Sequence, residues 1–389
     1  MRQINCLEGF AKSFGDAKNV RVFFAPGRVN LIGEHTDYNG GHVFPCALSM
    51  GTYVAIRKRN DRKLRFFSEN FSQSGIYEFS LDTLEPHSNH TWTAYPCGVI
   101  WAMAQEGNMI SSGFDMWVFG NIPNGSGLSS SASLEVVTGY ALGQIYNIPM
   151  QNDHIALLGQ TAENGYVGMN CGIMDQFAVA MGKEGQAIYL NTGTLEYQYA
   201  PLVLDGYDIL IMDTRKKRGL KDSKYNDRVK ECTQALEILR RYADVSSLCN
   251  ATEEILDKAK ADMPETIYRR ARHAITEDRR TQRAVEALEK NDIVQFGKLM
   301  NASHASLETD YEVSGKELDS LVHNAWDCDG VIGARMTGAG FGGCAVALVR
   351  SERTESVKAY VGDRYNKETG LTAAFYIASA GNGPMEIID

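Results

Sequence analysis

Short apolar blocks and helical patterns alternate along the first half of the chain. The block 20–25 predicts a strand, and we expect it to end at Pro26-Gly27 because proline removes a backbone donor. From about Ser131, apolar residues recur every three or four positions, which predicts an amphipathic helix. The same reasoning predicts strands at 52–58, 63–68 and 114–119, helices at about 153–166 and 174–181, and a strand pair at 186–191 and 195–200.

Helices dominate the second half, after a strand at Tyr207–Met212. Tyr225 begins an apolar stripe with spacings of four and three residues, which predicts a long helix and makes Tyr225 a candidate for the core. The chain divides near residues 200–206, which predicts domains at 1–203 and 204–389. The remaining pattern predicts helices at about 265–290, 293–307 and 315–327, then strand 332–337, a glycine turn, strand 344–349, helix 353–366 and strand 372–378.

Composition and charge narrow the class of protein. The 389 residues are 44% hydrophobic and 22% charged, as in an ordinary globular protein. The formal net charge of −9 argues against a dedicated nucleic-acid binder, which needs surplus cations. The arginines of 269–283 are interleaved with acids, so we expect a solvated, ion-paired helix face there. Glycine is in excess, with 37 residues against 9 prolines, which indicates tight backbone turns.

The eight cysteines are scattered, without a CxxC pair or a spacing suited to zinc. The first residues lack the apolar core of a secretory leader, and no apolar run reaches the length of a membrane span. We therefore expect free thiols, a cytoplasmic location and no membrane contact.

A serine-rich loop lies between the predicted strand 114–119 and the helix from Ser131. Free N–H groups and the positive end of a helix dipole suit an anion, and hydroxyls add donors or a ligand for Mg²⁺. A simple N-capping cluster is the alternative, but two glycines and three consecutive serines exceed what a cap requires. The candidate phosphate-binding residues are Gly125, Ser126, Gly127, Leu128, Ser129, Ser130 and Ser131.

Two further glycine-rich segments stand out. Residues 338–343 contain GxGxxG, but a strand follows them, so a dinucleotide-binding fold is excluded and a strand-connecting loop remains. Residues 27–38 place Glu34, His35 and Asp37 within four positions, which suits either a metal or hydrogen bonds to vicinal sugar hydroxyls.

In their order along the chain, the segments 27–38, 125–131 and 338–343 resemble the three motifs of the GHMP small-molecule kinases. Segment 27–38 closely resembles the galactokinase signature within that superfamily. The resemblance extends over most of the chain. It implies an α+β, two-domain fold with an N-terminal domain like ribosomal protein S5 domain 2, a C-terminal ferredoxin-like domain and the active site in the cleft between them. It also implies phosphorylation of D-galactose by ATP at the anomeric C1 hydroxyl, the entry step of galactose catabolism, giving α-D-galactose 1-phosphate and ADP.

The resemblance also implies roles for individual residues. Asp175, in the block 171–176, would be the general base, and Arg28 would favour its carboxylate form and stabilise the transferring phosphoryl group. Mg²⁺ would bind Ser131 and Glu163, with ATP as co-substrate. The sugar would contact Glu34, His35, Asp37, Gly172, Asp175 and Tyr225.

Several alternatives stay open at this stage. Asp175 also suits the first turn of a helix, where an acid is favourable, and Glu163 lies near an apolar helix face, where a carboxylate needs a partner. Rival functions are an N-acetylgalactosamine, mevalonate or homoserine kinase, and a sugar- and ATP-binding regulator without catalysis. Such regulators lack a Ser-Ala pair that is present here as Ser131-Ala132, which favours activity. We expect a monomer, with a weak homodimer as the alternative.

Overall fold

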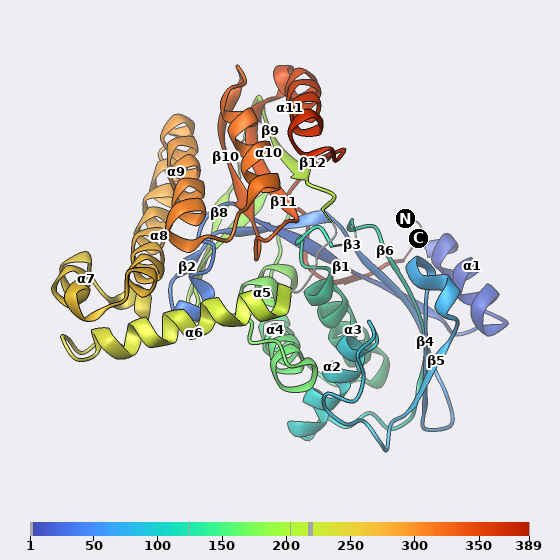
Figure 1. The fold of residues 1–389 in the computed structure, drawn as a ribbon. Helices are drawn as coiled ribbons and strands as arrows, with labels where there is room; N and C mark the ends of the chain where they lie inside the picture. The colour runs from blue at the N-terminus through green and yellow to red at the C-terminus, as the bar shows by residue number, and fades with distance from the viewer. Residues whose placement is uncertain (1–2, 124, 203, 217–220, 389) are drawn as a thin grey trace.

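The computed structural model describes residues 3–123, 125–202, 204–216 and 221–388 (Figure 1). A six-stranded sheet forms the first half, in the order β13-β1-β3-β6-β4-β5. Its pairs are antiparallel except β4 with β6. The strands are β1 (Arg21–Asn30), β3 (Pro45–Lys58), β4 (Lys63–Ser68), β5 (Tyr77–Ser80), β6 (Phe114–Gly120) and β13 (Met385–Glu386).

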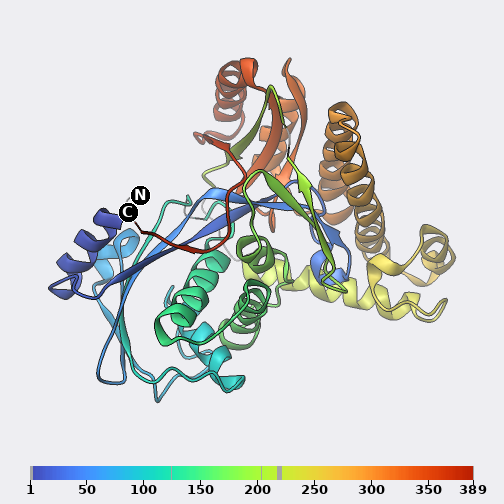
Figure 2. The same ribbon diagram turned by 180° about the vertical axis from the view of Figure 1, so that it is seen from behind.

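A four-stranded antiparallel sheet forms the second half, in the order β10-β11-β9-β12. One helical crossover joins β9 to β10, a hairpin joins β10 to β11, and a second crossover joins β11 to β12, which is the ferredoxin-like topology that was expected. Its strands are β9 (Tyr207–Asp213), β10 (Val331–Thr337), β11 (Cys344–Arg350) and β12 (Ala374–Ala378). A small third sheet holds β2 (His42–Val43), β7 (Gln186–Asn191) and β8 (Tyr197–Pro201), seen best in Figure 2.

Helices cover both large sheets and bury their apolar faces. In the first half α2, α3, α4 and α5 gather on one face of the six-stranded sheet (Figures 1 and 2). Helix α1 packs against strands β1, β3 and β6 of the same sheet. These helices are α1 (Gln3–Phe14), α2 (Ala94–Gln105), α3 (Ser130–Tyr146), α4 (Asn152–Thr161) and α5 (Met174–Ala180). The second half contains α6 (Lys221–Leu239), α7 (Glu253–Ala259), α8 (Glu265–Glu289), α9 (Ile293–Ser306), α10 (Lys316–Trp326) and α11 (Thr354–Thr369).

Short helical turns connect several of these elements. Two are π-helical and extend α4 and α9 directly, at Ala162–Val167 and Leu307–Tyr311. The others are 3₁₀ turns at Asp37–Asn39, Glu69–Ser74, Leu248–Asn250, Lys260–Asp262 and Ser351–Arg353.

The predicted end of the first strand at Pro26-Gly27 is wrong. Strand β1 continues to Asn30, and its register with β3 shifts between Pro26 and Arg28. This β-bulge accommodates Pro26, which has no N–H to donate to the partner strand, and the strand continues past it. Arg28 is thereby redirected, and its N–H binds the carbonyl of Leu128 at 3.2 Å instead of extending a regular ladder. The other predicted strands and helices are present, whereas α1, α2, α7 and the short strands β2, β5 and β13 were not foreseen.

The two halves are joined by buried polar contacts and by the end of the chain. Strand β13 pairs with β1, so the C-terminal residues return to the first sheet and the two ends lie side by side (Figure 2). Arg335 of β10 is fully buried and donates to the carbonyl of Asn30 at 3.1 Å. Residue 203, the expected domain boundary, lies outside the described residues, and the division into two domains stays a prediction.

The arginine-rich helix α8 is ion-paired as expected, but it is not simply a solvated face. Arg270 is only 3% exposed and binds Glu231 of α6 and Glu312. Arg272 pairs with Asp310, so most partners come from neighbouring elements. Among the helices that the structure describes, none is long and apolar enough to cross a membrane.

We expect Gly297→Ala to destabilise the protein. A Cβ at Gly297 of α9 would lie 2.2 Å from the carbonyl oxygen of Ile332 in β10, so helix and strand would have to separate. Overpacking of this kind costs roughly 1–3 kcal/mol, which urea denaturation would measure. Gly362→Ala is the control, because its Cβ would meet only a Phe375 ring carbon at 3.3 Å. Equal stability of the two variants would contradict the close approach.

Candidate active site

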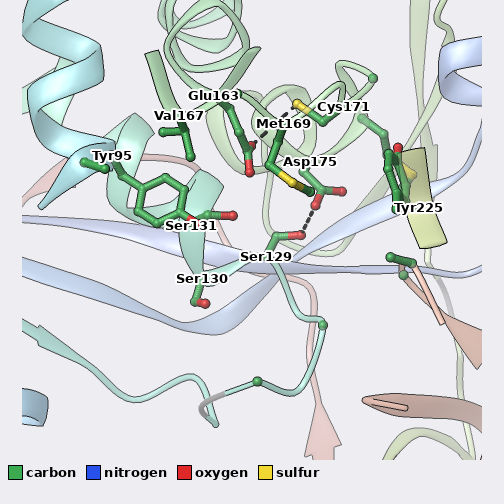
Figure 3. A pocket seen from close by; sticks show the side chains of 18 of the residues that line it. Tyr95, Ser129, Ser130, Ser131, Glu163, Val167, Met169, Cys171, Asp175 and Tyr225 are labelled. Carbon is green, nitrogen blue, oxygen red and sulfur yellow. Dashed lines mark hydrogen bonds between the residues drawn. The ribbon is translucent and has the colours of Figure 1, made fainter. Parts of the chain in front are cut away.

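A cavity of about 620 Å³ lies between the two halves and is lined by all three glycine-rich segments. Figure 3 shows part of its lining, including Ser129, Ser130 and Ser131. The first segment contributes Arg28 at the end of β1 and the loop that follows it. The second is the serine loop between β6 and α3, and the third is the hairpin loop 338–341 between β10 and β11. Segments far apart in sequence therefore meet at one site, as the sequence predicted.

Asp175 occupies the centre of this cavity. One carboxylate oxygen accepts a hydrogen bond from Arg28 Nε at 2.8 Å and forms an ion pair with a terminal guanidinium nitrogen of Arg28 at 2.6 Å. The other carboxylate oxygen accepts from the Ser129 hydroxyl at 2.6 Å, drawn as a dashed line in Figure 3. Arg28 is buried, whereas the Asp175 side chain is 32% exposed. Asp175 does lie in the first turn of α5, but its side chain points into the cavity and is held from two sides.

Each glycine-rich segment also holds one non-glycine residue in the left-handed backbone region. These are His35 at φ 62°, Ser129 at φ 59° and Phe341 at φ 57°. Such conformations cost of order 1–3 kcal/mol each and are retained where neighbouring contacts over-determine them. All three residues line the cavity, so the strain is concentrated at the candidate site.

Glu34 is buried between the two halves. Its carboxylate accepts the N–H of Gly338 at 2.7 Å and lies 3.4 Å from the Arg335 guanidinium. Burial raises the pKa of Glu34, and Arg335, Arg28 and the Gly338 N–H partly offset this. A Cβ on Gly338 would lie 2.8 Å from the carbonyl of Gly127, so the hairpin loop touches the serine loop here. Glu34 thus ties the first segment to the third.

Asp37 packs against Gly172, with no room for a side chain between them. A Cβ on Gly172 would lie 2.1 Å from an Asp37 carboxylate oxygen. Burial raises the pKa of Asp37 to about 7, and the negative charges of Asp175 and Glu34 add to the shift. These two predicted site residues are therefore in contact, and the position of the Asp37 carboxylate requires glycine at residue 172.

His35 and Tyr225 form an aromatic wall of the cavity. His35 Nδ1 lies 2.8 Å from the Tyr38 hydroxyl, which in turn lies 2.7 Å from the Tyr311 hydroxyl. Burial lowers the pKa of His35 to about 3, so its ring is neutral. The Tyr225 ring centroid is 5.9 Å from His35 and 5.4 Å from Tyr38. Tyr225 therefore packs on other aromatic rings and also faces the cavity, so both of its expected roles are compatible with the structure.

The serine loop presents only part of its residues to the cavity. Leu128 is fully buried and packs in the core, while its carbonyl accepts the backbone N–H of Arg28. Ser126 is 1% exposed, and its hydroxyl is without a hydrogen-bond partner among the described residues. Gly127 accepts from Arg28 at 2.7 Å through its carbonyl. The residues that face the cavity are Gly125, Gly127, Ser129, Ser130 and Ser131.

Glu163 and Ser131 offer oxygen ligands of the kind that Mg²⁺ prefers. Both line the cavity, and Glu163 is 8% exposed. Burial and the charge of Asp175 raise the pKa of Glu163 to about 7, while hydrogen bonds from Cys171, Gln176 and Ser131 oppose the shift. A buried carboxylate without a cation partner is unfavourable, so the donor set fits a hard divalent ion.

One other cluster could be taken for a metal site, namely His304, Glu308 and His323. His304 Nδ1 accepts the backbone N–H of Met336 at 3.1 Å, so the proton of the neutral ring sits on Nε2. That nitrogen faces Asp319 at 3.4 Å and has no lone pair for a metal. His323 Nε2 lies 3.0 Å from a Glu308 carboxylate oxygen, so the cluster is accounted for without a metal.

One wall of the cavity is formed by residues that were not predicted from the sequence. Residues 89–92 and Tyr95, at and before the start of α2, line it together with Val167 and Met169. Figure 3 shows Tyr95 and Val167 at the end of the cavity opposite Tyr225. The aromatic residues at 92 and 95 were visible in the sequence, but nothing in the local pattern linked them to the serine loop.

Family models match three parts of the chain. The galactokinase galactose-binding signature matches residues 8–58, the GHMP kinase N-terminal domain 94–183 and the GHMP kinase C-terminal region 284–367. The crystal structure of mevalonate kinase from Methanococcus jannaschii shares the fold, with a TM-score of 0.67 at 20% identity, covering 93% of this chain and 98% of that one. Fold and motifs together define a GHMP kinase.

Closer relatives narrow the assignment. The galactokinase of Exiguobacterium sibiricum is 51% identical over 97% of this chain and 96% of its own length. That of Clostridium beijerinckii is 50% identical over the full length of both. The crystal structure of Lactococcus lactis galactokinase complexed with galactose matches with a TM-score of 0.96 at 45% identity, covering 98% of this chain and 99% of that one. The chain belongs to the galactokinase family.

We expect Asp37→Asn to stabilise the ligand-free protein. The carboxyl pKa rises from 3.8 to about 7 on folding, so its ionisation opposes folding progressively between those values and fully above pH 7. The variant should gain on the order of 1–3 kcal/mol at pH 8 and clearly less at pH 5.

Urea denaturation at both pH values measures this gain. Asp244→Asn, on an exposed segment, is the matched control and should show no pH-dependent difference from the parent chain. If the gain in stability of Asp37→Asn over the parent chain is no larger at pH 8 than at pH 5, the raised pKa of Asp37 is contradicted.

Proposed function

We propose that the chain phosphorylates D-galactose at its anomeric C1 hydroxyl with ATP, giving α-D-galactose 1-phosphate and ADP. The observation that carries the proposal is the position of Asp175, held by Arg28 and Ser129 in the cavity where all three glycine-rich segments meet. Membership of the galactokinase family supports the same reaction.

The sugar would lie at the end of the cavity near Tyr225. Glu34 and Asp37 supply carboxylate acceptors for hydroxyl groups, and the neutral His35 ring supplies an aromatic surface beside them. Gly172 leaves the Asp37 carboxylate room to reach the sugar. A cavity with converging acceptors favours a polyhydroxylated substrate over mevalonate or homoserine.

The nucleotide would extend from the serine loop toward Tyr95. The backbone of Gly125–Ser131 and the N-terminus of α3 favour the phosphates, which an acidic protein can bind through local N–H donors. The purine would contact Trp92, Tyr95, Val167 and Met169, which give that end its apolar and aromatic lining.

Mg²⁺ would be held by Ser131 and Glu163, where it would neutralise charge on the phosphates. Asp175 would accept the proton of the C1 hydroxyl as the oxygen attacks the γ-phosphorus. Arg28 orients the Asp175 carboxylate through a hydrogen bond and an ion pair and places positive charge beside the transferring group. Because phosphoryl transfer has a loose transition state, positioning and charge neutralisation are the main contributions of these residues.

Other features of the chain stay predictions. The structure pairs none of the eight cysteines in a disulfide, which supports a reducing, cytoplasmic location. The topology of the two large sheets supports two domains near 1–203 and 204–389, with the chain end returning to the first. We still expect a monomer, with a weak homodimer as the alternative.

A coupled ADP-release assay tests the proposed reaction. The purified protein is given ATP and Mg²⁺ with galactose, N-acetylgalactosamine, glucose or mevalonate in turn. We expect turnover with galactose to exceed the others by at least roughly tenfold in kcat/KM. Greatest turnover with N-acetylgalactosamine or mevalonate would identify a different kinase, and binding of galactose without ADP release would identify a regulator.

Asp175→Asn tests the catalytic base. The amide cannot accept the hydroxyl proton, so kcat should fall roughly 10²–10⁴-fold, while galactose binding measured by calorimetry stays within a few fold. Asp153→Asn, which alters an exposed acid in the first turn of α4, is the control for a helix N-terminal effect. Near-normal kcat for the Asp175 variant would refute the role of this residue.

A further inference from the structure

Glu135 is a fully buried carboxyl group that forms no ion pair with any residue that the structure describes. It lies in the middle of α3, one turn beyond Ser131, and its exposed fraction is 0%. One of its oxygens accepts the amide N–H of Gln176 at 2.9 Å, and the other has no partner among the described residues. Burying a carboxyl group with one unpaired oxygen lowers the free energy of unfolding relative to an apolar side chain of the same volume. A role beyond stability would explain why this position carries an acid.

The same Gln176 amide reaches the predicted metal ligand. Its nitrogen lies 2.7 Å from a Glu163 carboxylate oxygen as well as 2.9 Å from Glu135, so its two hydrogens serve the two carboxyl groups. A Cβ on Gly159 would lie 2.9 Å from Gln176 Cγ and 3.4 Å from a Glu135 oxygen. Gly159 of α4 therefore leaves the space that the side chains of Gln176 and Glu135 occupy, so three elements fit together at this pair.

The contact with Glu135 decides which end of the amide faces Glu163. With Glu135 accepting one hydrogen, the NH₂ group is turned toward both carboxyl groups, and Glu163 receives the second hydrogen. Rotation of the amide by half a turn would bring its oxygen against the Glu163 carboxylate and repel it. Without Glu135, one of the two contacts that oppose this rotation is lost.

We propose that Glu135 is a positioning residue that, through the Gln176 amide, holds Glu163 in the orientation that binds the divalent cation of the nucleotide complex. This rests on the proposed assignment of Glu163 to the metal. Loss of such an outer contact weakens metal binding by about 10–100-fold in metalloproteins. The effect should therefore be on cation affinity first and on catalysis only as a consequence.

The test is Mn²⁺ binding in the presence of a non-hydrolysable ATP analogue, followed by the electron paramagnetic resonance signal of free Mn²⁺. Glu135→Leu should bind Mn²⁺ about 10–100-fold more weakly than the parent chain, without loss of thermal stability. Glu135→Gln should bind within roughly threefold of the parent, because its amide oxygen still accepts from Gln176. Thr138→Val is the control, a buried change on the same helix that leaves the amide untouched.

Two further variants make the outcome decisive. Gln176→Leu should weaken Mn²⁺ binding as Glu135→Leu does, and the double variant should be no worse than Gln176→Leu alone. If Glu135→Leu does not fold, the comparison of Gln176→Leu with Glu135→Gln carries the test. Unchanged Mn²⁺ affinity in Glu135→Leu, or additive losses in the double variant, would overturn the proposal.

Glu163→Gln separates this proposal from the one on which it rests. If Glu163→Gln abolishes Mn²⁺ binding and Glu135→Leu does not weaken it, only the positioning role fails. If Glu163→Gln binds Mn²⁺ like the parent, the metal assignment itself fails.

Discussion

Crowding of carboxyl groups around one cavity is the constraint on which the rest of this structure depends. Glu34, Asp37, Glu163 and Asp175 all line it, and the guanidinium among its described lining residues is Arg28. Burial and mutual repulsion raise the pKa of Asp37 and Glu163 to about 7. A kinase whose ligands bring hydroxyl donors and a divalent cation needs this excess of acceptors, and the protein bears the unfavourable charge until those ligands bind.

The fold offsets that crowding with cations buried behind the cavity. Arg335 has no exposed surface and lies between Glu34 and Glu277, which it approaches at 3.4 Å and 3.9 Å. Burial alone would raise the pKa of Glu277, but Arg280, His273 and Arg335 lower it to about 2. Glu277 then accepts the backbone N–H of Gly33 at 3.0 Å. The loop that carries Glu34 and His35 is thus fixed to a helix of the other half of the molecule.

Local pattern predicted those parts of the site whose chemistry is local. The serine loop needs only glycines, hydroxyls and a helix start, so it could be proposed from its neighbours in sequence. The role of Asp175 came instead from the resemblance of its block to a family motif, because its local pattern equally suits a helix N-terminal acid. Trp92 and Tyr95 reach the cavity only because α2 packs beside α3, which no short window encodes. Glu135 was hidden inside an apolar helical pattern, and the bulge at Pro26 required knowledge of the partner strand.

Strain and charge at this site are linked through the same loops. Ser129 adopts its left-handed backbone while its hydroxyl donates to Asp175. Gly338 donates its N–H to Glu34, and Thr337, the residue before it, donates its hydroxyl to the carbonyl of Asn30. Two of the three strained residues, Ser129 and His35, therefore lie at or next to a hydrogen bond that holds a carboxylate in place, that of Asp175 and that of Glu34. Relaxing the backbone would release that carboxylate into a crowded cavity, where repulsion is already high. The geometry that disfavours the empty cavity is consequently the geometry that keeps its acceptors aimed at a ligand.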